Sequence, residues 1–177
     1  MGTIIGIACL CVIIFLIIYI IGVCGVDKVE NAYRKEASTV DTYLWDMQHR
    51  LKKAATVLEK YNIDTSEIKD PQELGLGMPV TMQIMKFSDY CTKVEKLKNA
   101  DRTSVTDEAD LADLKKYDEE LEALRIEVIT NSTRHNKAVN AYNSKIAKFP
   151  YSFVAKRKGK EPKGIFAYVM KNTGGQN

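Results

Sequence analysis

The N-terminal stretch from Thr3 to Val26 reads TIIGIACLCVIIFLIIYIIGVCGV and carries no charge and no proline. Because a helix rises about 1.5 Å per residue, roughly 20 apolar residues are enough to cross the hydrocarbon core of a bilayer. A soluble domain seldom accommodates so long a helix that is apolar on every face. The sequence therefore predicts a transmembrane anchor over residues 3–26.

A cleaved signal peptide is the competing interpretation of this stretch. Such a peptide begins with a positively charged region and ends at a small-residue cleavage site. Only Met1 and Gly2 precede Thr3, so the charged region is missing. Cys24 is a weak candidate for a lipoprotein cysteine, because the residues before it do not match the small-residue consensus. We therefore expect a retained, single-pass anchor.

The distribution of cysteine and of positive charge limits what the remaining 150 or so residues can be, which is the length of one ordinary domain. Three of the four cysteines lie in the predicted anchor, and only Cys91 remains outside it. This excludes a disulfide scaffold and a cysteine-rich zinc site, and Cys91 is expected to be a buried thiol. Lys28, Arg34 and Lys35 follow the anchor closely, whereas no Lys or Arg precedes it. The positive-inside rule then predicts an N-terminus outside the cell and a cytoplasmic domain.

Apolar residues continue beyond the anchor at steps of three or four, which is a heptad pattern typical of helices that pack together. The predicted seam consists of Val26, Val29, Tyr33, Ala37, Val40, Leu44, Met47, Leu51, Ala54, Leu58 and Tyr61. No Gly or Pro lies between Val26 and Tyr61, so we expect the anchor to run directly into this soluble helix.

Two further long helices follow a break in the pattern. The stretch 62–79 holds two prolines and two glycines and is predicted to be a loop, with a short helix over 66–73 left open. A second helix is predicted over 80–99, with Val80, Ile84, Phe87, Cys91 and Val94 as its buried stripe. A third is predicted from an N-cap at Thr106 to Pro150. The fold class is therefore all-α: an anchor over 3–26, an antiparallel helical bundle over 27–150, and a cationic C-terminal segment over 151–177.

The C-terminal third resembles a known family in its motifs. The run RHNKAV at 134–139, then AYN at 141–143 and FP at 149–150, is similar to the closing motif of the LemA family, and the match continues through FVA at 153–155, Gly159, PK at 162–163 and Phe166. This resemblance implies a membrane-anchored four-helix bundle without known catalytic residues. Because the family has members in magnetosome membranes, the resemblance is also compatible with a membrane-organising role. The chain is a divergent member on this interpretation, because its tail is cationic where the family's tail is apolar.

No constellation for catalysis or metal binding is evident. The HExxH, G-x-S-x-G and P-loop patterns are absent from the sequence. We expect His49 to be a surface residue and His135 to be a hydrogen-bonded core residue. Neither a cofactor nor nucleic acid is expected, since no basic surface interleaved with aromatic residues is evident.

Asn136, Asn140 and Asn143 lie on or beside the seam of the third helix. A buried asparagine costs stability but can fix the register between packed helices. We predict this structural role for the three asparagines rather than a ligand site.

The cationic C-terminal segment contains the candidate contact residues for lipid or for a protein partner. These residues are Lys156, Arg157, Lys158, Lys160, Lys163, Phe153 and Phe166. Near an anionic leaflet each cation contributes about 1 kcal/mol of attraction. A solvated tail is the alternative, and geometry separates the two: three long helices running up and down leave Pro150 distant from the membrane, whereas four bring it back.

Together these features predict a bacterial single-pass cell-membrane protein that acts as an interaction partner or scaffold without catalysis. Its protein partner is not identified by the sequence. The alternative is a ligand-responsive sensor or an accessory subunit of a membrane enzyme, for which a polar pocket between the helices would be evidence.

Overall fold

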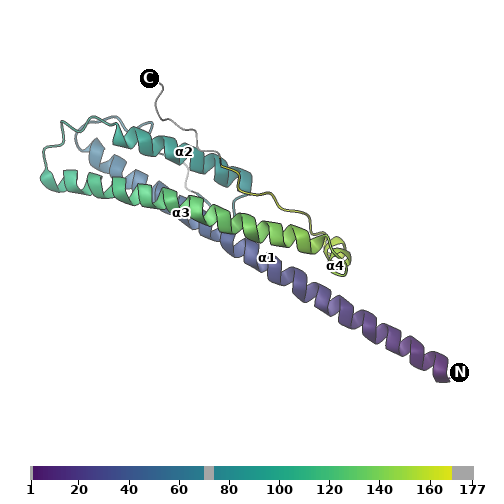
Figure 1. Cartoon of the computed structure of the whole chain (residues 1–177). Helices are drawn as coiled ribbons and strands as arrows, with labels where there is room; N and C mark the ends of the chain where they lie inside the picture. The colour runs from purple at the N-terminus through teal and green to yellow at the C-terminus, as the bar shows by residue number, and fades with distance from the viewer. Residues whose placement is uncertain (1, 70–73, 169–177) are drawn as a thin grey trace. The chain divides into compact units, whose positions relative to one another are not determined.

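The structure, a computed structural model, describes residues 2–69 and 74–168, with side chains from Ile5 onward. It contains four helices in these residues: α1 (Gly2–Glu59), α2 (Val80–Lys98), α3 (Glu108–Ile146) and α4 (Tyr151–Arg157) (Figure 1). The described residues form no strand. The predicted all-α fold class is therefore confirmed.

Helix α1 continues without a break from the apolar stretch into the heptad seam, as the absence of proline after residue 26 predicted. Its first part exposes large apolar side chains, including Ile7, Leu10 and Phe15 at half or more of their area. This is the one helix among the described residues that is long and apolar enough to cross a membrane, a property that a signal sequence shares. Further along, the seam is buried at Val26, Val40, Leu44, Met47, Leu51, Ala54 and Leu58.

The chain folds as two compact units. Of the described residues, those within 1–36 and 134–165 form unit 1, and those within 37–133 and 166–177 form unit 2. Each has its own apolar core. The core of unit 1 is formed by Val26, Tyr142, Ile146, Val154 and Ala155. The core of unit 2 is larger and includes Leu44, Met47, Leu51, Phe87, Tyr90, Val94, Leu114, Leu121 and Val128. Cys91 is 7% exposed in unit 2, as expected of a buried thiol.

Ion pairs between α1 and α3 establish the direction of these helices in unit 2. Arg50 pairs with Glu120 at 2.9 Å. Ten residues further along the chain, Lys60, which directly follows α1, pairs with Asp110 at 2.8 Å. As the residue number rises on one helix it falls on the other, so α1 and α3 are antiparallel.

Helix α2 is antiparallel to α3 by the same reasoning, and so it runs parallel to α1. Lys98 pairs with Glu122 at 2.9 Å, and Glu95 pairs with Arg125 at 3.3 Å. A parallel α2 requires the chain to return along the bundle between Glu59 and Val80, and the described residues of this stretch, 60–69 and 74–79, form no helix (Figure 1).

Buried polar side chains of α1 hold this returning segment. The Asp41 carboxylate accepts hydrogen bonds from the Gly77 backbone N–H at 2.7 Å and from the Gln83 side chain at 2.6 Å. Gln48 accepts one from the Leu74 backbone N–H at 3.1 Å. These bonds satisfy backbone donors of a segment that lacks secondary structure, which a buried loop requires.

Some boundaries differ from the predicted ones. Residues 66–68 form only a turn, so the described part of 66–73 is not a helix, and 70–73 lie outside the described residues. Helix α3 is capped by Asp107, whose Oδ1 accepts from the Ala109 N–H at 2.8 Å, rather than by Thr106. It ends at Ile146 instead of reaching Pro150.

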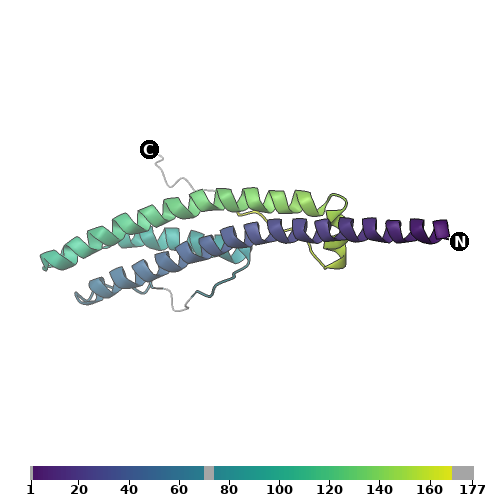
Figure 2. The same ribbon diagram turned by 90° about the horizontal axis from the view of Figure 1, so that it is seen from below.

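In unit 1, α4 follows Pro150 and lies across α1 (Figure 2). Its buried face is Val154 and Ala155. Helix α4 ends where Gly159 adopts φ of +62°, a left-handed conformation that glycine takes without strain.

Candidate membrane-contact site

Two glycines of α1 form the surface on which α4 packs. A Cβ atom on Gly22 would lie 2.7 Å from Cγ2 of Val154, and one on Gly25 would overlap the ring of Tyr151. Side chains at these two positions would therefore separate the helices. These glycines were not predicted as a contact surface, although small residues let helix backbones approach closely in membranes.

Aromatic residues surround this contact. The rings of Phe15 and Phe153 meet edge to face with centroids 6.1 Å apart. The Lys145 ammonium lies 4.3 Å from the centroid of the Tyr151 ring, a cation–π geometry. A small cavity of about 90 Å³ opens beside these rings. It is lined by Phe15, Ile18, Tyr19, Phe149, Pro150, Phe153 and Val154.

Two of the five predicted contact cations form ion pairs with α1. Lys158 lies 3.1 Å from Asp27, and Lys160 lies 2.8 Å from Glu30. Both carboxylates directly follow the apolar stretch of α1. These pairs therefore attach the segment after α4 to the first charged turns beyond the candidate membrane span.

Glu30 is the most buried carboxylate of this group, at 6% exposure. Its burial alone would raise its pKa, but hydrogen bonds from Lys160 and Arg34 outweigh that effect and hold the pKa of Glu30 below its ordinary value. The carboxylate is therefore charged in the folded state at neutral pH, and Lys160 is held by a charged partner.

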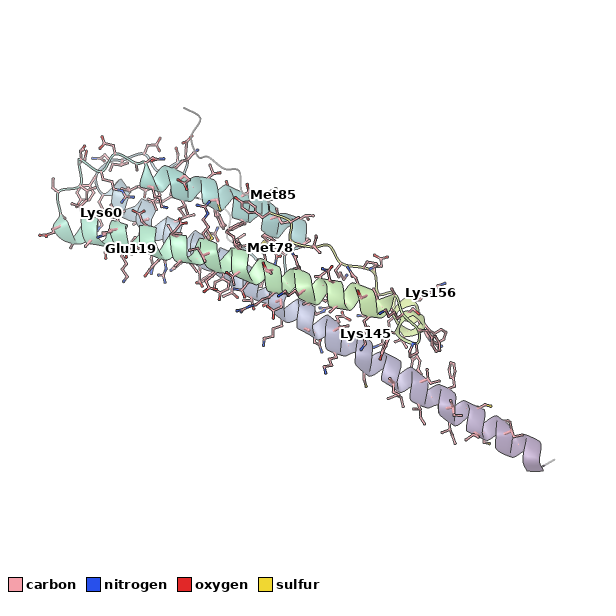
Figure 3. The ribbon with its side chains drawn as sticks, viewed as in Figure 1. Lys60, Met78, Met85, Glu119, Lys145 and Lys156 are labelled. Atoms are coloured by element: carbon pink, nitrogen blue, oxygen red, sulfur yellow. The ribbon has the colours of Figure 1, made fainter. Side chains whose placement is uncertain are left out.

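The other three cations have exposed side chains. Lys156 and Arg157 end α4, and Figure 3 labels Lys156 there, with Lys145 on the neighbouring end of α3. Lys163 is anchored by its backbone, because the Asn143 side chain donates to its carbonyl at 2.9 Å and accepts from its N–H at 2.8 Å. Cationic side chains of Lys156, Arg157 and Lys163 thus remain accessible to an external anion.

The two predicted aromatic contacts differ in position. Phe153 belongs to the α4 site and is 45% exposed. Phe166 is 3% exposed in the core of unit 2, where its ring lies 6.1 Å from that of Phe87. Phe166 therefore cannot contact lipid through its ring, and that part of the prediction is wrong.

The three asparagines do not form a buried seam. Asn140 is exposed and cannot fix the register between helices, so its predicted role is wrong. Asn136 and Asn143 are half-buried, and Asn143 holds the tail rather than a facing helix. The buried polar residues of α3 are instead Asn131 and His135.

The two histidines have contrasting surroundings. His49 is exposed and stacks on Trp45 with ring centroids 5.3 Å apart. His135 is 3% exposed, and neither of its ring nitrogens has a hydrogen-bond partner, contrary to the expected hydrogen-bonded core residue. Burial lowers the pKa of His135, although the charge of Glu36 acts in the opposite direction.

Over the residues that the structure describes, no group of three His, Cys, Asp or Glu side chains is arranged to hold a metal ion. In comparisons with family models, curated proteins and solved structures, nothing was found that matches this chain.

Proposed function

We propose that this chain is a single-pass membrane protein that holds a helical bundle at the cytoplasmic face of a bacterial membrane and acts there as a non-catalytic interaction or scaffold protein of the LemA type. The observation that carries the proposal is helix α1, which passes from an exposed apolar stretch into a buried bundle seam without interruption. A helix of this kind couples an anchor to a soluble bundle with no flexible linker between them.

The cytoplasmic orientation is supported by charge. Lys28, Arg34 and Lys35 closely follow the apolar stretch. In unit 1, Lys145 at the end of α3 and Lys158 directly after α4 add further cations beside the same end of the apolar stretch. A concentration of Lys and Arg at one end of a span favours the cytoplasmic side for that end.

Anchoring is tested by washing membranes that contain the full chain with alkaline carbonate and measuring the intact mass of the retained protein. We expect the chain to stay in the membrane fraction with residues 3–26 still present. The matched variant, Ile13→Lys with Ile17→Lys, should move to the soluble fraction, because each lysine at mid-span costs roughly 3 kcal/mol. Release of the unaltered chain by carbonate, or a mass lacking this stretch, would contradict the proposal.

The scaffold role is tested by photo-crosslinking from exposed apolar positions of unit 2. These positions are Trp45, Met82, Met85 and Ile126. We expect a discrete protein adduct from at least one of them and none from the exposed control position Asp113. If none of the four positions gives an adduct, unit 2 does not bind a protein partner through these residues.

A second candidate function is the ligand-responsive sensor or accessory subunit of a membrane enzyme. One observation favours it: the His135 ring nitrogens and the Tyr142 hydroxyl are buried in unit 1 without hydrogen-bond partners. A small molecule that raises the unfolding temperature of the full chain, but not of the His135→Leu variant, would favour the sensor. A reproducible turnover that is lost in the same variant would favour an enzyme.

A further inference from the structure

Helix α4 meets α1 within the apolar stretch rather than beyond it. Val154 packs at Gly22, and the Tyr151 ring packs at Gly25. Both glycines lie in the 3–26 segment, on the side toward the bundle. An element packed at this level of a membrane-spanning helix is at the level of the bilayer as well.

The first charged residues after α4 lie beside the first charged residues that follow the apolar stretch of α1. Lys158 pairs with Asp27 and Lys160 pairs with Glu30, which are the first two acidic residues after the apolar stretch. Two elements that are far apart in sequence thus change from apolar to charged side by side. This is the pattern expected of two elements that cross one bilayer–water boundary together.

Exposed aromatic rings extend from this corner further along the apolar stretch. Phe149 is 77% exposed and Phe153 is 45% exposed, which is unusual for phenylalanine in water. Phe153 contacts Phe15, which lies 11 helical steps, or about 16 Å, before Val26 at the end of the apolar stretch. Interfacial helices bury their apolar faces about 5–10 Å deep, at the boundary of headgroups and acyl chains. A ring that contacts Phe15 lies deeper than that, and so it reaches the acyl chains.

From this geometry we propose that α4 and the preceding corner at Phe149 form a wedge inserted into the leaflet on the bundle side of the membrane. The exposed rings of Phe149 and Phe153 contact acyl chains, and Lys156 and Arg157 contact the phosphates of anionic lipids. The proposal rests on the proposed function in one respect, since it requires residues 3–26 to span the bilayer.

The cavity beside Phe15 and Phe153 is lined by apolar side chains, and we infer that a lipid acyl chain occupies it. Its volume of about 90 Å³ is smaller than the roughly 150 Å³ of a cavity that holds benzene, so it admits only part of one acyl chain. Its lining is continuous with the exposed apolar surface of α1, which lipid must surround if α1 spans a bilayer. Insertion of such a wedge into one leaflet makes binding sensitive to curvature and lipid composition, which suits a membrane-organising protein.

The test places a single tryptophan in the full chain reconstituted into phosphatidylcholine vesicles brominated on the acyl chains. In a Trp45→Phe background, Phe149→Trp reports on the wedge and Phe15→Trp reports on the anchor. We expect bromine to quench the fluorescence of both variants. Quenching of the Phe15→Trp variant alone would overturn the wedge and leave the anchor intact. Quenching of neither would overturn the anchoring on which the wedge depends.

Lipid preference is tested with the Phe149→Trp variant in equal mixtures of phosphatidylcholine and phosphatidylglycerol, with bromine on only one of the two lipids. We expect stronger quenching when phosphatidylglycerol carries the bromine, and loss of that difference on adding Lys156→Gln and Arg157→Gln. Equal quenching from the two lipids before these changes would overturn the contact with anionic lipid. If the difference in quenching persists after both substitutions, Lys156 and Arg157 do not make the contact with anionic lipid.

Discussion

His135 places an imidazole in the interior of unit 1 without a hydrogen-bond partner. Because burial lowers its pKa below 6.5, the folded state favours the neutral ring. Protonation of His135 therefore has no effect on stability above about pH 6.5, and it lowers the free energy of unfolding as the pH falls from there toward the folded-state pKa. We expect His135→Leu to raise the free energy of unfolding by roughly 1 kcal/mol at pH 7, by removing an unsatisfied buried group, and by more at pH 5.

The measurement is the urea midpoint of the detergent-solubilised full chain between pH 5 and pH 8. The urea midpoint should fall less between pH 7 and pH 5 in the His135→Leu variant than in the unaltered chain. His49→Leu is the matched control, because His49 is exposed and should leave the pH profile as it is. A profile that is unchanged by His135→Leu would show that another group titrates with unfolding.

Gly25 is the second residue with a sharp prediction, since a methyl group there meets the Tyr151 ring. We expect Gly25→Ala to weaken the packing of α4 by about 1–3 kcal/mol, the usual cost of overpacking. Hydrogen exchange of peptides covering 151–157 should quicken at least tenfold. Gly6→Ala is the control, because no atom lies within 4 Å of a Cβ placed on Gly6. Equal exchange rates in both variants would mean that α4 does not depend on the glycine surface.

At the scale of the helices, the repeating apolar pattern predicted the buried face of α1. Features that do not repeat, such as the path of the returning segment, were not predicted. The seam of α1 follows from period alone, and Val40, Leu44 and Met47 are fully buried as that period requires. The path of the returning segment depends on Asp41 and Gln48, whose buried hydrogen bonds leave no trace in an apolar pattern. The end of α3 at Ile146 was missed for a similar reason, since the expected boundary rested on Pro150 alone.

Asp41 connects three elements, so its loss should be costly. Asp41→Ala removes hydrogen bonds to the Gly77 N–H and to Gln83, each of which is worth about 1.5–3 kcal/mol when the acceptor is charged. We expect the free energy of unfolding to fall by roughly 3 kcal/mol and hydrogen exchange to rise over 74–77. Asp113→Ala removes an exposed carboxylate from α3 and should change neither quantity. If both variants unfold alike, Asp41 does not hold the segment.

At the scale of the whole chain, the returning segment makes α2 parallel to α1, so that α3 is antiparallel to both within unit 2. The sequence left open whether three long helices or four bring Pro150 toward the anchor. In unit 2, the described residues between Glu59 and Val80 contain no helix, and α3 is antiparallel to α1. In unit 1, α4 packs on Gly22 and Gly25. The number of helices alone could not predict this arrangement. The sequence shows how long the connection between α1 and α2 is, but not in which direction it runs.

Orientation across the membrane is the remaining prediction at this scale. Lys28, Arg34 and Lys35 follow the apolar stretch, so we expect Ser104, an exposed residue between α2 and α3, to lie inside the cell. In a chain whose four cysteines are replaced by alanine, Ser104→Cys should resist a membrane-impermeant maleimide in intact cells and react completely after lysis.

Two control variants in the same assay separate the causes of protection. Gly2→Cys should react in intact cells, because the N-terminus is expected outside. A chain that keeps Cys91 alone should stay unreactive after lysis until it is unfolded, since its thiol is buried and burial raises its pKa. Reaction of the Ser104→Cys variant in intact cells would place the bundle outside. The positive-inside argument would then be wrong for this chain, and any anionic lipid bound by α4 would belong to the outer leaflet.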